Sequence, residues 1–408
     1  MSNLVAQHPV LVVAVIKIAV LMFLLLTALA YLTWFERKVV AHIQSRWGPY
    51  RAGPHGLLQP LADGLKFLFK EDVTPSGADR FVYYLAPFLT LSLSLTAIAL
   101  IPFGPGEFKL FGQRTSLGIA NLNIGLLFLF AITSLGVYGV ALAGWSSNSK
   151  YPLLGGLRSS AQMVSYELAL TMSVVGVLLL AGSFNLREII AAQQGFLWGW
   201  LPRWNIFASP MPQVIGFSCF FTAAIAETNR LPFDLPEAEG ELVAGFHTEY
   251  ASFKFAMFFM GEYASMITVS CLATILFFGG WLSPFPQIAA LAWMRYLPTA
   301  LLAAGSAWLV WDGIRYETLL GKIVLPVLGV VLAGLAVLVA LPGANDFAQG
   351  PFWFLGKVFI FLFIYVWVRG TLPRFRYDQL MAVGWKLLLP ASLANIVLTS
   401  FAMVVGKR

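Results

Sequence analysis

The sequence predicts an all-α polytopic membrane protein with about ten transmembrane helices. Hydrophobic residues make up 59% of its 408 residues and charged residues only 11%, whereas soluble proteins carry about 25% charged residues. Ten apolar runs are long enough for a bilayer, which takes about 20 residues to cross. No internal repeat or linker divides the chain, so we expect residues 1–408 to form a single integral membrane domain.

The ten predicted spans follow one another with short loops between most of them. They cover residues 10–35, 81–102, 119–143, 161–183, 207–228, 252–282, 288–311, 324–342, 352–371 and 380–404. The first run is too long for the apolar region of a signal peptide and lacks a small-residue cleavage site, so we expect it to be a retained helix.

The distribution of Lys and Arg predicts the orientation of the chain. Fifteen of these residues lie in the odd-numbered loops and six in the even-numbered loops and termini. Cytoplasmic loops carry the excess of positive charge. We therefore expect odd-numbered loops in the cytoplasm and both termini on the outer, periplasmic side of the cell's inner membrane. The net charge of +7 is then an orientation signal, and no nucleic-acid partner is expected.

Cysteine and histidine are too sparse for metal or redox chemistry within this chain. Cys219 and Cys271 lie in separate apolar runs, and the four histidines are scattered. Iron–sulfur and zinc sites need clustered ligands. No glycine-rich nucleotide motif follows a predicted strand either. We expect no flavin, nicotinamide, iron–sulfur cluster or metal bound by this chain.

The first cytoplasmic loop, residues 36–80, predicts a short amphipathic helix. Its apolar side chains recur at helical spacing with Asp63, Lys66 and Lys70 between them. These apolar residues are Leu57, Leu58, Leu61, Leu65, Leu68 and Phe69. Such a helix is typical of the membrane interface.

Acidic residues concentrate in one stretch, Glu227 to Glu262. Seven of the 19 Asp and Glu residues lie there: Glu227, Asp234, Glu237, Glu239, Glu241, Glu249 and Glu262. Carboxylates packed together raise one another's pKa and can hold protons near neutral pH. The stretch therefore indicates a proton-handling site. An acidic loop, residues 229–251, that docks a basic partner is the alternative.

Within this stretch, Glu237, Glu239 and Glu241 alternate with small residues. Glu237 and Glu241 share a face of a helix, and all three share a face of an extended segment. Pro232 and Pro236 flank Phe233 and Asp234, which favours a stiff turn before them.

Ionisable residues inside predicted spans are functional candidates, because their burial in lipid is costly. Glu167 and Glu262 lie within runs, and Glu36 and Glu227 end runs. Lys254 precedes Glu262 by two helical turns and is a candidate partner. Ordinary interfacial placement of Glu36 and Glu227, and a structural ion pair for Glu262, are the alternatives. We assign three further lysines to snorkelling or packing: Lys17, Lys357 and Lys386.

Four stretches of this sequence together resemble one family. They read RWGPYRAGPHGLLQPLADGLKFLFKEDVTP, SSNSKYPLLGGLRSSAQMVSYELALT, AETNRLPFDLPEAEGELVAGFHTEYASFKFAMFFMGEY and RGTLPRFRYDQLMAVGWKLLLP. They look like the quinone-chamber membrane subunit (the H/1 subunit family) of proton-translocating NADH:quinone oxidoreductase, respiratory complex I. The resemblance covers residues 10–285 and 351–404.

The resemblance implies a chamber between the first span, the interfacial helix and the sixth span, where ubiquinone or menaquinone is reduced as substrate. The electron donor would be an iron–sulfur cluster in a neighbouring peripheral-arm subunit. Antiporter-like and small membrane subunits would be further partners. Residues that match the family's acidic path are Glu36, Glu167, Glu227, Glu237, Glu239, Glu241 and Glu262. Residues that match polar and aromatic positions around the chamber are Arg37, Arg46, Asp63, Lys66, Arg230 and Phe233.

The chain departs from the family pattern of eight spans in residues 287–350. This segment adds the runs 288–311 and 324–342, and we expect an inserted, peripheral helical pair that preserves the topology of the last two spans.

We hypothesise that charge changes at the quinone shift the coupled carboxylate pKa values and so move protons. The chain would then be one subunit of a translocase without a complete active site of its own. The alternatives are a related membrane anchor of an energy-converting hydrogenase or deazaflavin-linked dehydrogenase, and a stand-alone proton-coupled transporter. The last usually shows repeats, which are absent from this sequence.

Overall fold

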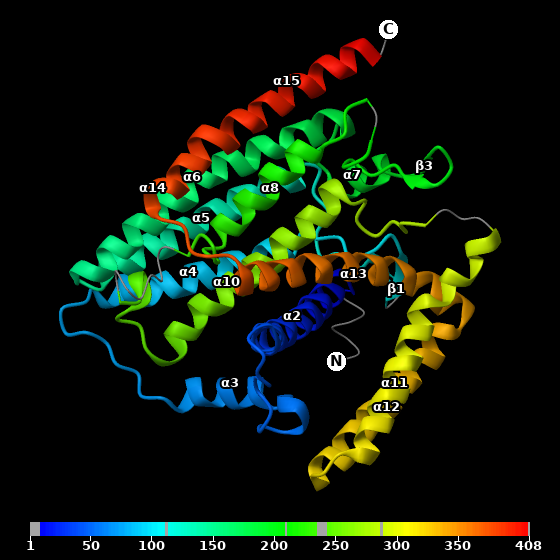
Figure 1. Cartoon of the computed structure of the whole chain (residues 1–408), viewed down its shortest axis with the longest axis horizontal. Helices are drawn as coiled ribbons and strands as arrows, with labels where there is room; N and C mark the ends of the chain where they lie inside the picture. The colour runs from blue at the N-terminus through cyan, green and yellow to red at the C-terminus, as the bar shows by residue number, and fades with distance from the viewer. Residues whose placement is uncertain (1–8, 111–112, 209, 235–242, 286–288, 407–408) are drawn as a thin grey trace.

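The computed structural model describes residues 9–110, 113–208, 210–234, 243–285 and 289–406, and its described part is an all-α polytopic membrane protein (Figure 1). Nine of the described helices are long and apolar enough to cross a membrane, and a tenth apolar helix is shorter. The first nine runs correspond to α2 (Pro9–Ile43), α4 (Arg80–Ile98), α5 (Gly125–Ser146), α6 (Lys150–Ala181), α8 (Val214–Glu227), α10 (Ser252–Phe277), α11 (Leu297–Arg315), α12 (Leu319–Ala340) and α13 (Pro342–Thr371). The last run comprises α14 (Tyr377–Ala382), the π-helical η4 (Val383–Leu388) and α15 (Leu389–Gly406). The predicted fold class is confirmed.

Several helices extend beyond the apolar runs that predicted them. α6 begins at Lys150, eleven residues before the predicted start at residue 161, and α13 begins at Pro342, ten residues before residue 352. α2 continues through the charged residues Glu36 to Lys38 as far as Ile43. Hydropathy locates the part of a helix that lies in lipid, whereas backbone hydrogen bonding carries the helix on into the polar region.

Short elements connect the long helices. They are η1 (Pro54–Gly56), α3 (Gln59–Phe69), α7 (Leu186–Ala192), η2 (Gly245–His247) and η3 (Ala289–Tyr296). Two antiparallel hairpins, which the sequence did not predict, complete the described part: β1 (Glu107–Leu110) with β2 (Gln113–Ser116), and β3 (Phe196–Leu197) with β4 (Leu201–Pro202). α3 occupies the place of the predicted amphipathic helix.

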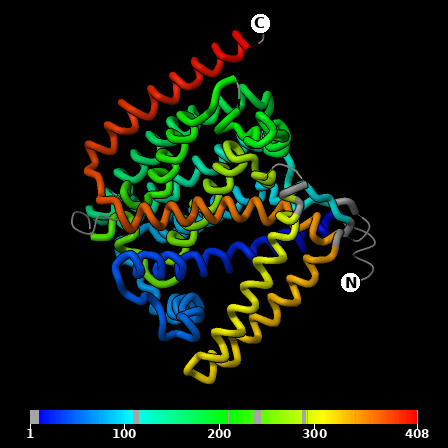
Figure 2. The backbone as a smooth tube through the Cα atoms, turned by 45° about the vertical axis from the view of Figure 1, so that its right-hand side comes forward, coloured from blue at the N-terminus to red at the C-terminus, as the bar shows by residue number. Residues whose placement is uncertain are grey.

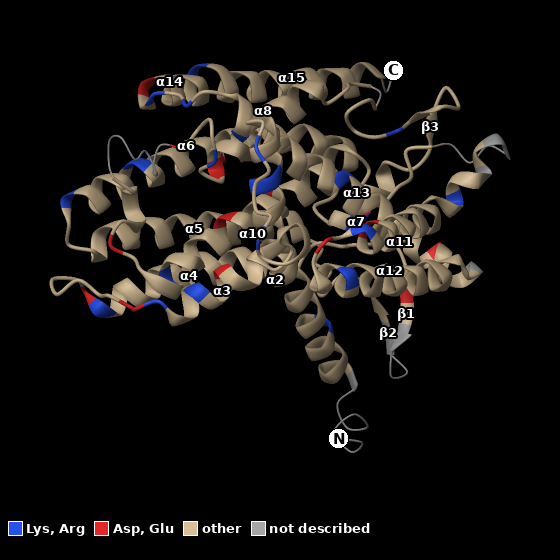
Figure 3. Ribbon diagram, turned by 60° about the horizontal axis from the view of Figure 1, so that its bottom comes forward, with Lys and Arg blue, Asp and Glu red and all other residues tan. Residues whose placement is uncertain are grey.

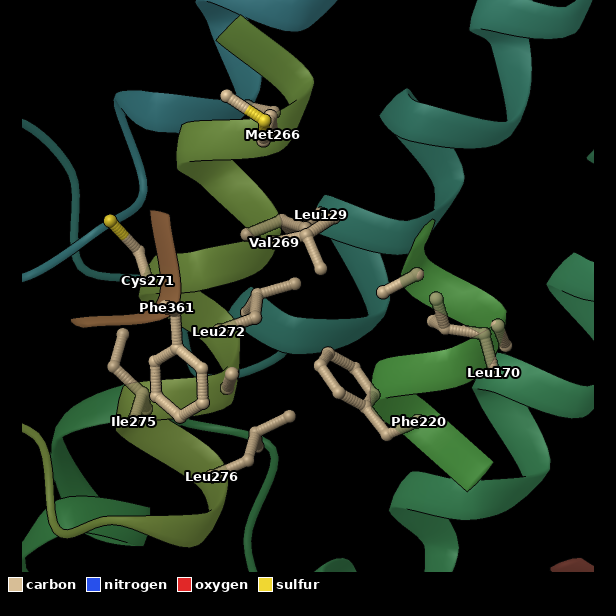
Figure 4. Packing of buried hydrophobic residues seen from close by; sticks show 14 of the residues in the cluster. Leu129, Leu170, Phe220, Met266, Val269, Cys271, Leu272, Ile275, Leu276 and Phe361 are labelled. Carbon is tan, nitrogen blue, oxygen red and sulfur yellow. The ribbon is translucent and has the colours of Figure 1, made fainter. Parts of the chain in front are cut away.

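α10 is the central helix of the bundle. In its most apolar window 72% of the residues are buried, compared with 11–39% in the other eight long spans. Figure 4 shows its inner face packed against three of its neighbours, with Phe220 of α8, Leu129 of α5 and Phe361 of α13 around it. The outer helices instead expose large apolar side chains, as expected of surfaces that face lipid.

Loops that the topology places on the same side of the membrane touch one another. The Phe375 N–H, in the ninth loop, donates to the Pro232 carbonyl of the fifth loop at 3.1 Å. The His55 N–H of the first loop donates to Tyr316 Oη of the seventh at 2.9 Å. An alternating set of ten spans brings odd-numbered loops together in this way.

α11 and α12 form a hairpin that lies side by side and extends from the main bundle (Figures 1 and 2). Its turn contains only residues 316–318, and the Thr318 hydroxyl accepts a hydrogen bond from the Gly321 N–H at 3.3 Å. Ser306 of α11 donates to the Gly329 carbonyl of α12 at 2.8 Å. Hydrogen bonds within the hairpin thus hold α11 and α12 together.

Lys357 of α13 has a structural partner set that the sequence did not reveal. Its Nζ donates to the carbonyls of Phe278, Gly280 and Leu282 at 2.7, 2.9 and 2.7 Å, and lies 4.3 Å from the centroid of the Trp204 ring. Carbonyls at the end of a helix lack intrahelical donors. Lys357 therefore does not snorkel: it is buried, and its Nζ binds the C-cap carbonyl of α10 and two carbonyls of the loop that follows.

Candidate functional site

The predicted site residues lie within the long helices, at helix ends and in the connecting loops. Glu36 and Arg37 belong to α2, Glu167 to α6, Glu227 to α8 and Glu262 to α10. Asp63 and Lys66 belong to α3, and Arg46, Arg230 and Phe233 to loops. Glu237, Glu239 and Glu241 lie outside the described residues. Figure 3 shows how few charged positions interrupt the otherwise uncharged helices.

Glu36 is a buried carboxylate between two guanidinium groups. Arg230 Nη1 lies 3.2 and 3.4 Å from its two oxygens, and Arg369 of α13 also pairs with it. The side chains of Glu36 and Arg230 are only 6% and 8% exposed. Buried charges persist only where opposite charges or hydrogen bonds compensate their desolvation. Glu36 therefore lies within a buried ion-pair cluster, which replaces the alternative of ordinary interfacial placement.

Arg230 connects this cluster to α10. Its guanidinium carbon lies 4.1 Å from the centroid of the Tyr263 ring, a cation–π geometry. Tyr263 follows Glu262 directly along the chain. The loop after α8, the end of α2 and the middle of α10 are thus held together by one arginine.

An apolar pocket opens between α2, α3 and α10, and we call it the α2–α3–α10 pocket. It encloses about 180 Å³. Its lining residues are Leu26, Leu29, Ala30, Thr33, Pro60, Asp63, Gly64, Phe67, Phe253, Ala256, Phe259, Met260 and Tyr263. Pockets of this kind, apolar with a few polar groups, suit a hydrophobic molecule with a polar head.

The polar side of this pocket is held in place by hydrogen bonds. Asp63 Oδ2 accepts from Arg37 Nη1 at 2.6 Å, and its Oδ1 accepts from Gln59 Nε2 at 2.9 Å. Ser252, at the start of α10, donates to the Phe67 carbonyl of α3 at 2.8 Å. The three walls of the pocket are therefore linked by polar contacts as well as by packing.

A second cavity, of about 50 Å³, lies deeper among α4, α5, α6, α8 and α10, and we call it the glutamate cavity. Glu227 and Glu262 both line it. Its other polar lining residues are Thr90, Ser94, Thr133, Thr228, Asn229, Ser265 and Thr268. Glu167 interacts electrostatically with Glu227. A cavity of this size with polar lining residues has room for ordered water, so two of the predicted glutamates, Glu227 and Glu262, line a wettable space, and Glu167 interacts with one of them.

The two ends of the acidic loop are anchored on either side of residues 235–242. At the first end, the Phe233 ring stacks on Phe375 with centroids 5.4 Å apart, and Asp234 pairs with Arg374 at 3.1 Å. At the second end, Tyr83 Oη donates to the Glu249 carbonyl at 2.7 Å. The stiff turn predicted at Pro232 is thus part of a fixed anchor.

His247 belongs to the anchored second end and is not a proton carrier near neutral pH. It is buried, with its ring edge-on to Phe246, Phe255 and Phe259. Burial lowers the pKa of its imidazole to about 4. The ring therefore packs as a neutral aromatic group.

Other candidates lie away from the pocket. Phe233 packs against Tyr166 and Phe375, and it does not line the α2–α3–α10 pocket. Arg46 and Lys66 are exposed. The expected pairing of Lys254 with Glu262 is replaced by an ion pair with Asp72 at 2.8 Å and a hydrogen bond to Thr74.

Comparisons with known proteins identify the family to which the sequence belongs. The NADH dehydrogenase family matches residues 16–400. The second of two NADH-quinone oxidoreductase H subunits of Koribacter versatilis is 52% identical over 399 residues, which cover 96% of each chain. The first NADH-quinone oxidoreductase H subunit of Solibacter usitatus is 49% identical over 389 residues, covering 95% of this chain and 96% of that protein.

The chain belongs to the H subunit family of NADH-quinone oxidoreductase. It is therefore a membrane subunit of complex I, as the resemblance implied. The alignments with these relatives cover 95–96% of the chain and so run across residues 287–350.

Two residues of the site in this complex I subunit were missed from the sequence. Arg369 lies at the end of the ninth predicted span and Tyr263 within the sixth, and neither is among the predicted site residues. Both lie in stretches that carried the resemblance, RGTLPRF and MGEY. Their roles depend on contacts with Glu36 and Arg230, which are distant in the sequence and have no local signal.

Proposed function

We propose that this membrane subunit of complex I forms, together with peripheral-arm subunits, the chamber in which quinone is reduced. The observation that carries the proposal is the α2–α3–α10 pocket, whose wall residue Tyr263 contacts Arg230. The apolar walls suit an isoprenoid tail, and Asp63 and Tyr263 offer polar groups to a head group. Ubiquinone and menaquinone both satisfy this description.

Quinone reduction to quinol takes two electrons and two protons. In this proposal the electrons come from the terminal iron–sulfur cluster of a neighbouring peripheral-arm subunit, and the chain contributes binding, positioning and protons. The names of its relatives, NADH-quinone oxidoreductase, favour this role over that of a hydrogenase anchor. The chain thus acts as one part of a proton-translocating enzyme.

The coupling element in this proposal is the set of glutamates between the pocket and the interior. A charge change at the quinone acts on the Arg230–Glu36–Arg369 cluster through Tyr263. The anchored acidic loop, with Glu237, Glu239 and Glu241, joins this cluster to Glu227. Glu227, Glu167 and Glu262 then pass protons by way of water in the glutamate cavity. Closely spaced carboxylates share protons as one coupled system.

In the cell, the odd-numbered loops would face the cytoplasm and the peripheral arm, with both termini on the periplasmic side of the inner membrane. α3 presents an exposed apolar face, with Leu61, Leu68 and Phe69 62%, 65% and 85% exposed. Such an apolar face needs lipid or a partner subunit to cover it. Antiporter-like and small membrane subunits would cover other faces of the bundle.

A pocket-filling substitution tests the quinone proposal. Gly64 lines the pocket, and a Cβ at this position would meet nothing within 4 Å. Gly64→Leu should therefore fill the pocket without disturbing α3, and raise the KM for quinone at least about tenfold, since a displaced apolar contact of this size is worth at least about 1.4 kcal/mol. The measurement is quinone reductase activity of membranes with the complex assembled.

Gly334→Leu is the matched control. Gly334 also lies in a helix, α12, with nothing within 4 Å of an added Cβ, and it is remote from the pocket lining. This variant should leave the KM unchanged. An unchanged KM in Gly64→Leu, with the complex assembled, would place the quinone elsewhere.

A further inference from the structure

The tip of the α11–α12 hairpin holds one residue of the first loop by several contacts. The His55 N–H donates to Tyr316 Oη at 2.9 Å, and His55 Nε2 lies 2.7 Å from Asp312 Oδ2. The His55 carbonyl accepts from Trp34 Nε1 of α2 at 3.3 Å. The N–H, the carbonyl and the ring of a single residue thus join α11, the adjoining turn and α2.

The backbone of His55 shows why these contacts matter. His55 has φ +51° and ψ +19°, the left-handed region that side chains with a Cβ disfavour. Gly56 follows with φ +78°, and a Cβ there would lie 2.4 Å from the Pro49 carbonyl oxygen. Such conformations persist where surrounding contacts determine them. At His55, the contacts with Tyr316 and Asp312 hold the backbone in this conformation.

The turn at His55 leads directly into one wall of the pocket. α3 starts at Gln59, four residues later, and provides Pro60, Asp63, Gly64 and Phe67 to the α2–α3–α10 pocket. The opposite wall is α2, which carries Trp34. The place where His55 is held therefore decides how α3 lies against α2.

We propose that the α11–α12 hairpin is a positioning element for the α2–α3–α10 pocket, acting through Asp312 and Tyr316 on His55. Neither Asp312 nor Tyr316 lines the pocket, so both are positioning residues. This role goes beyond the expectation that the inserted helical pair is peripheral. The inference rests on the proposed function, in which this pocket takes quinone.

The test is the double variant Asp312→Ala/Tyr316→Phe in the whole complex. It removes both hydrogen bonds to His55 and keeps the Tyr316 ring, whose centroid lies 5.1 Å from that of His55. We expect the KM for quinone to rise about fivefold or more, because two hydrogen bonds, one involving a charged group, fix the turn. The kcat should stay within about twofold, since no residue at the reacting atoms changes.

A second readout reports on the turn itself. Amide hydrogen exchange of residues 50–58 should become faster in the assembled double variant, because the His55 N–H loses its acceptor. The single variant Asp312→Asn should have a KM close to that of the wild type, since the amide oxygen still accepts a hydrogen bond from the His55 ring. If the double variant fails to assemble, Tyr316→Phe alone should still raise both exchange and KM.

Asp346→Ala is the matched control, because it removes a carboxylate by the same substitution as Asp312→Ala. Asp346 of α13 pairs with Arg295 of η3 at the other end of the hairpin, and both side chains are exposed. Its loss should change neither KM nor exchange in residues 50–58. An unchanged KM in the assembled Asp312→Ala/Tyr316→Phe variant would overturn the inference. If Gly64→Leu raises the KM in the same membranes, the proposed function stands while the positioning role falls.

Discussion

Arg230 and Tyr263 lie face to face, with the guanidinium carbon 4.1 Å from the ring centroid. Tyr263 lines the apolar pocket, and Arg230 binds the buried Glu36. One contact thus links a cavity suited to quinone with a buried cluster of charges. A change of charge in the pocket would act on Arg230 through this contact, because the buried surroundings screen it weakly.

Removal of the Tyr263 ring should weaken quinone binding. Tyr263→Leu loses the cation–π contact with Arg230, which is worth about 1–2 kcal/mol when desolvated, and we expect the KM for quinone to rise up to about tenfold. Tyr263→Phe keeps the ring and should remain close to wild type. Steady-state quinone titrations of membranes measure both. Equal KM values for the Leu and Phe variants would contradict this role of the ring.

Loss of Arg369 should destabilise the subunit through Glu36. In Arg369→Met, the buried Glu36 carboxylate keeps only Arg230, and we expect a loss of about 1–2 kcal/mol. The value is modest because the Arg369 side chain is 35% exposed. Thermal stability of the purified complex measures it. Glu36→Gln added to Arg369→Met should lower the thermal stability further, because it also removes the charge that pairs with the buried Arg230; a recovery of stability would contradict this pairing.

Lys357→Met should lower the free energy of unfolding by more than a typical lysine substitution does. The C-cap carbonyl of α10 and two carbonyls of the following loop would lose their donor, and we expect at least about 3 kcal/mol of destabilisation. Lys386→Met is the control, since Lys386 is also a lysine of the last third of the chain but is exposed, and should change stability by less than about 0.5 kcal/mol. Assembly on native gels and thermal stability report the difference. Similar losses in both variants would argue against the cap.

His247 should make the complex less stable in mild acid. The folded pKa is about 4 and the ordinary value is 6.5, so the unfolded chain binds more protons between these values. The contribution of the neutral His247 ring to the free energy of unfolding is therefore fully present above pH 6.5. It decreases as the pH falls toward 4, by roughly 3 kcal/mol in total.

His247→Phe removes this titration and suits the aromatic surroundings. The difference in thermal stability between the wild type and this variant should therefore change between pH 7 and pH 5. If the difference is the same at both pH values, His247 is not buried as a neutral ring.

The spans were predictable from sequence because lipid imposes a simple requirement on composition and length. Ten runs of apolar residues sufficed to find the nine long candidate spans and the shorter apolar helix α8. Helix ends were less predictable: Lys150 to Ser160 carry polar residues and two glycines, yet they form the start of α6. Tertiary contacts decide such segments, and single-residue propensity does not show them.

Some residues of the candidate site could be predicted from the sequence, and others could not. Glu167, Glu227 and Glu262 could be selected because charge within a span is rare. Contacts between residues distant in the sequence could not be predicted. Arg369 pairs with Glu36 from the far end of the chain, and Asp312 contacts His55 across 257 residues. Lys357 likewise finds its three carbonyls 75–79 residues away. A sequence shows which residues need partners, whereas packing selects the partners.

The most direct measurement is the number of protons translocated per quinone reduced in assembled complexes that carry Glu227→Gln or Glu262→Gln. Both residues line the glutamate cavity, and the isosteric amide removes the titratable proton. Glu188→Gln, at an exposed carboxylate of α7, is the control. We expect both cavity variants to assemble but to lose proton translocation, while the control keeps it. A wild-type ratio in Glu227→Gln and Glu262→Gln would contradict the claim that these glutamates carry the protons.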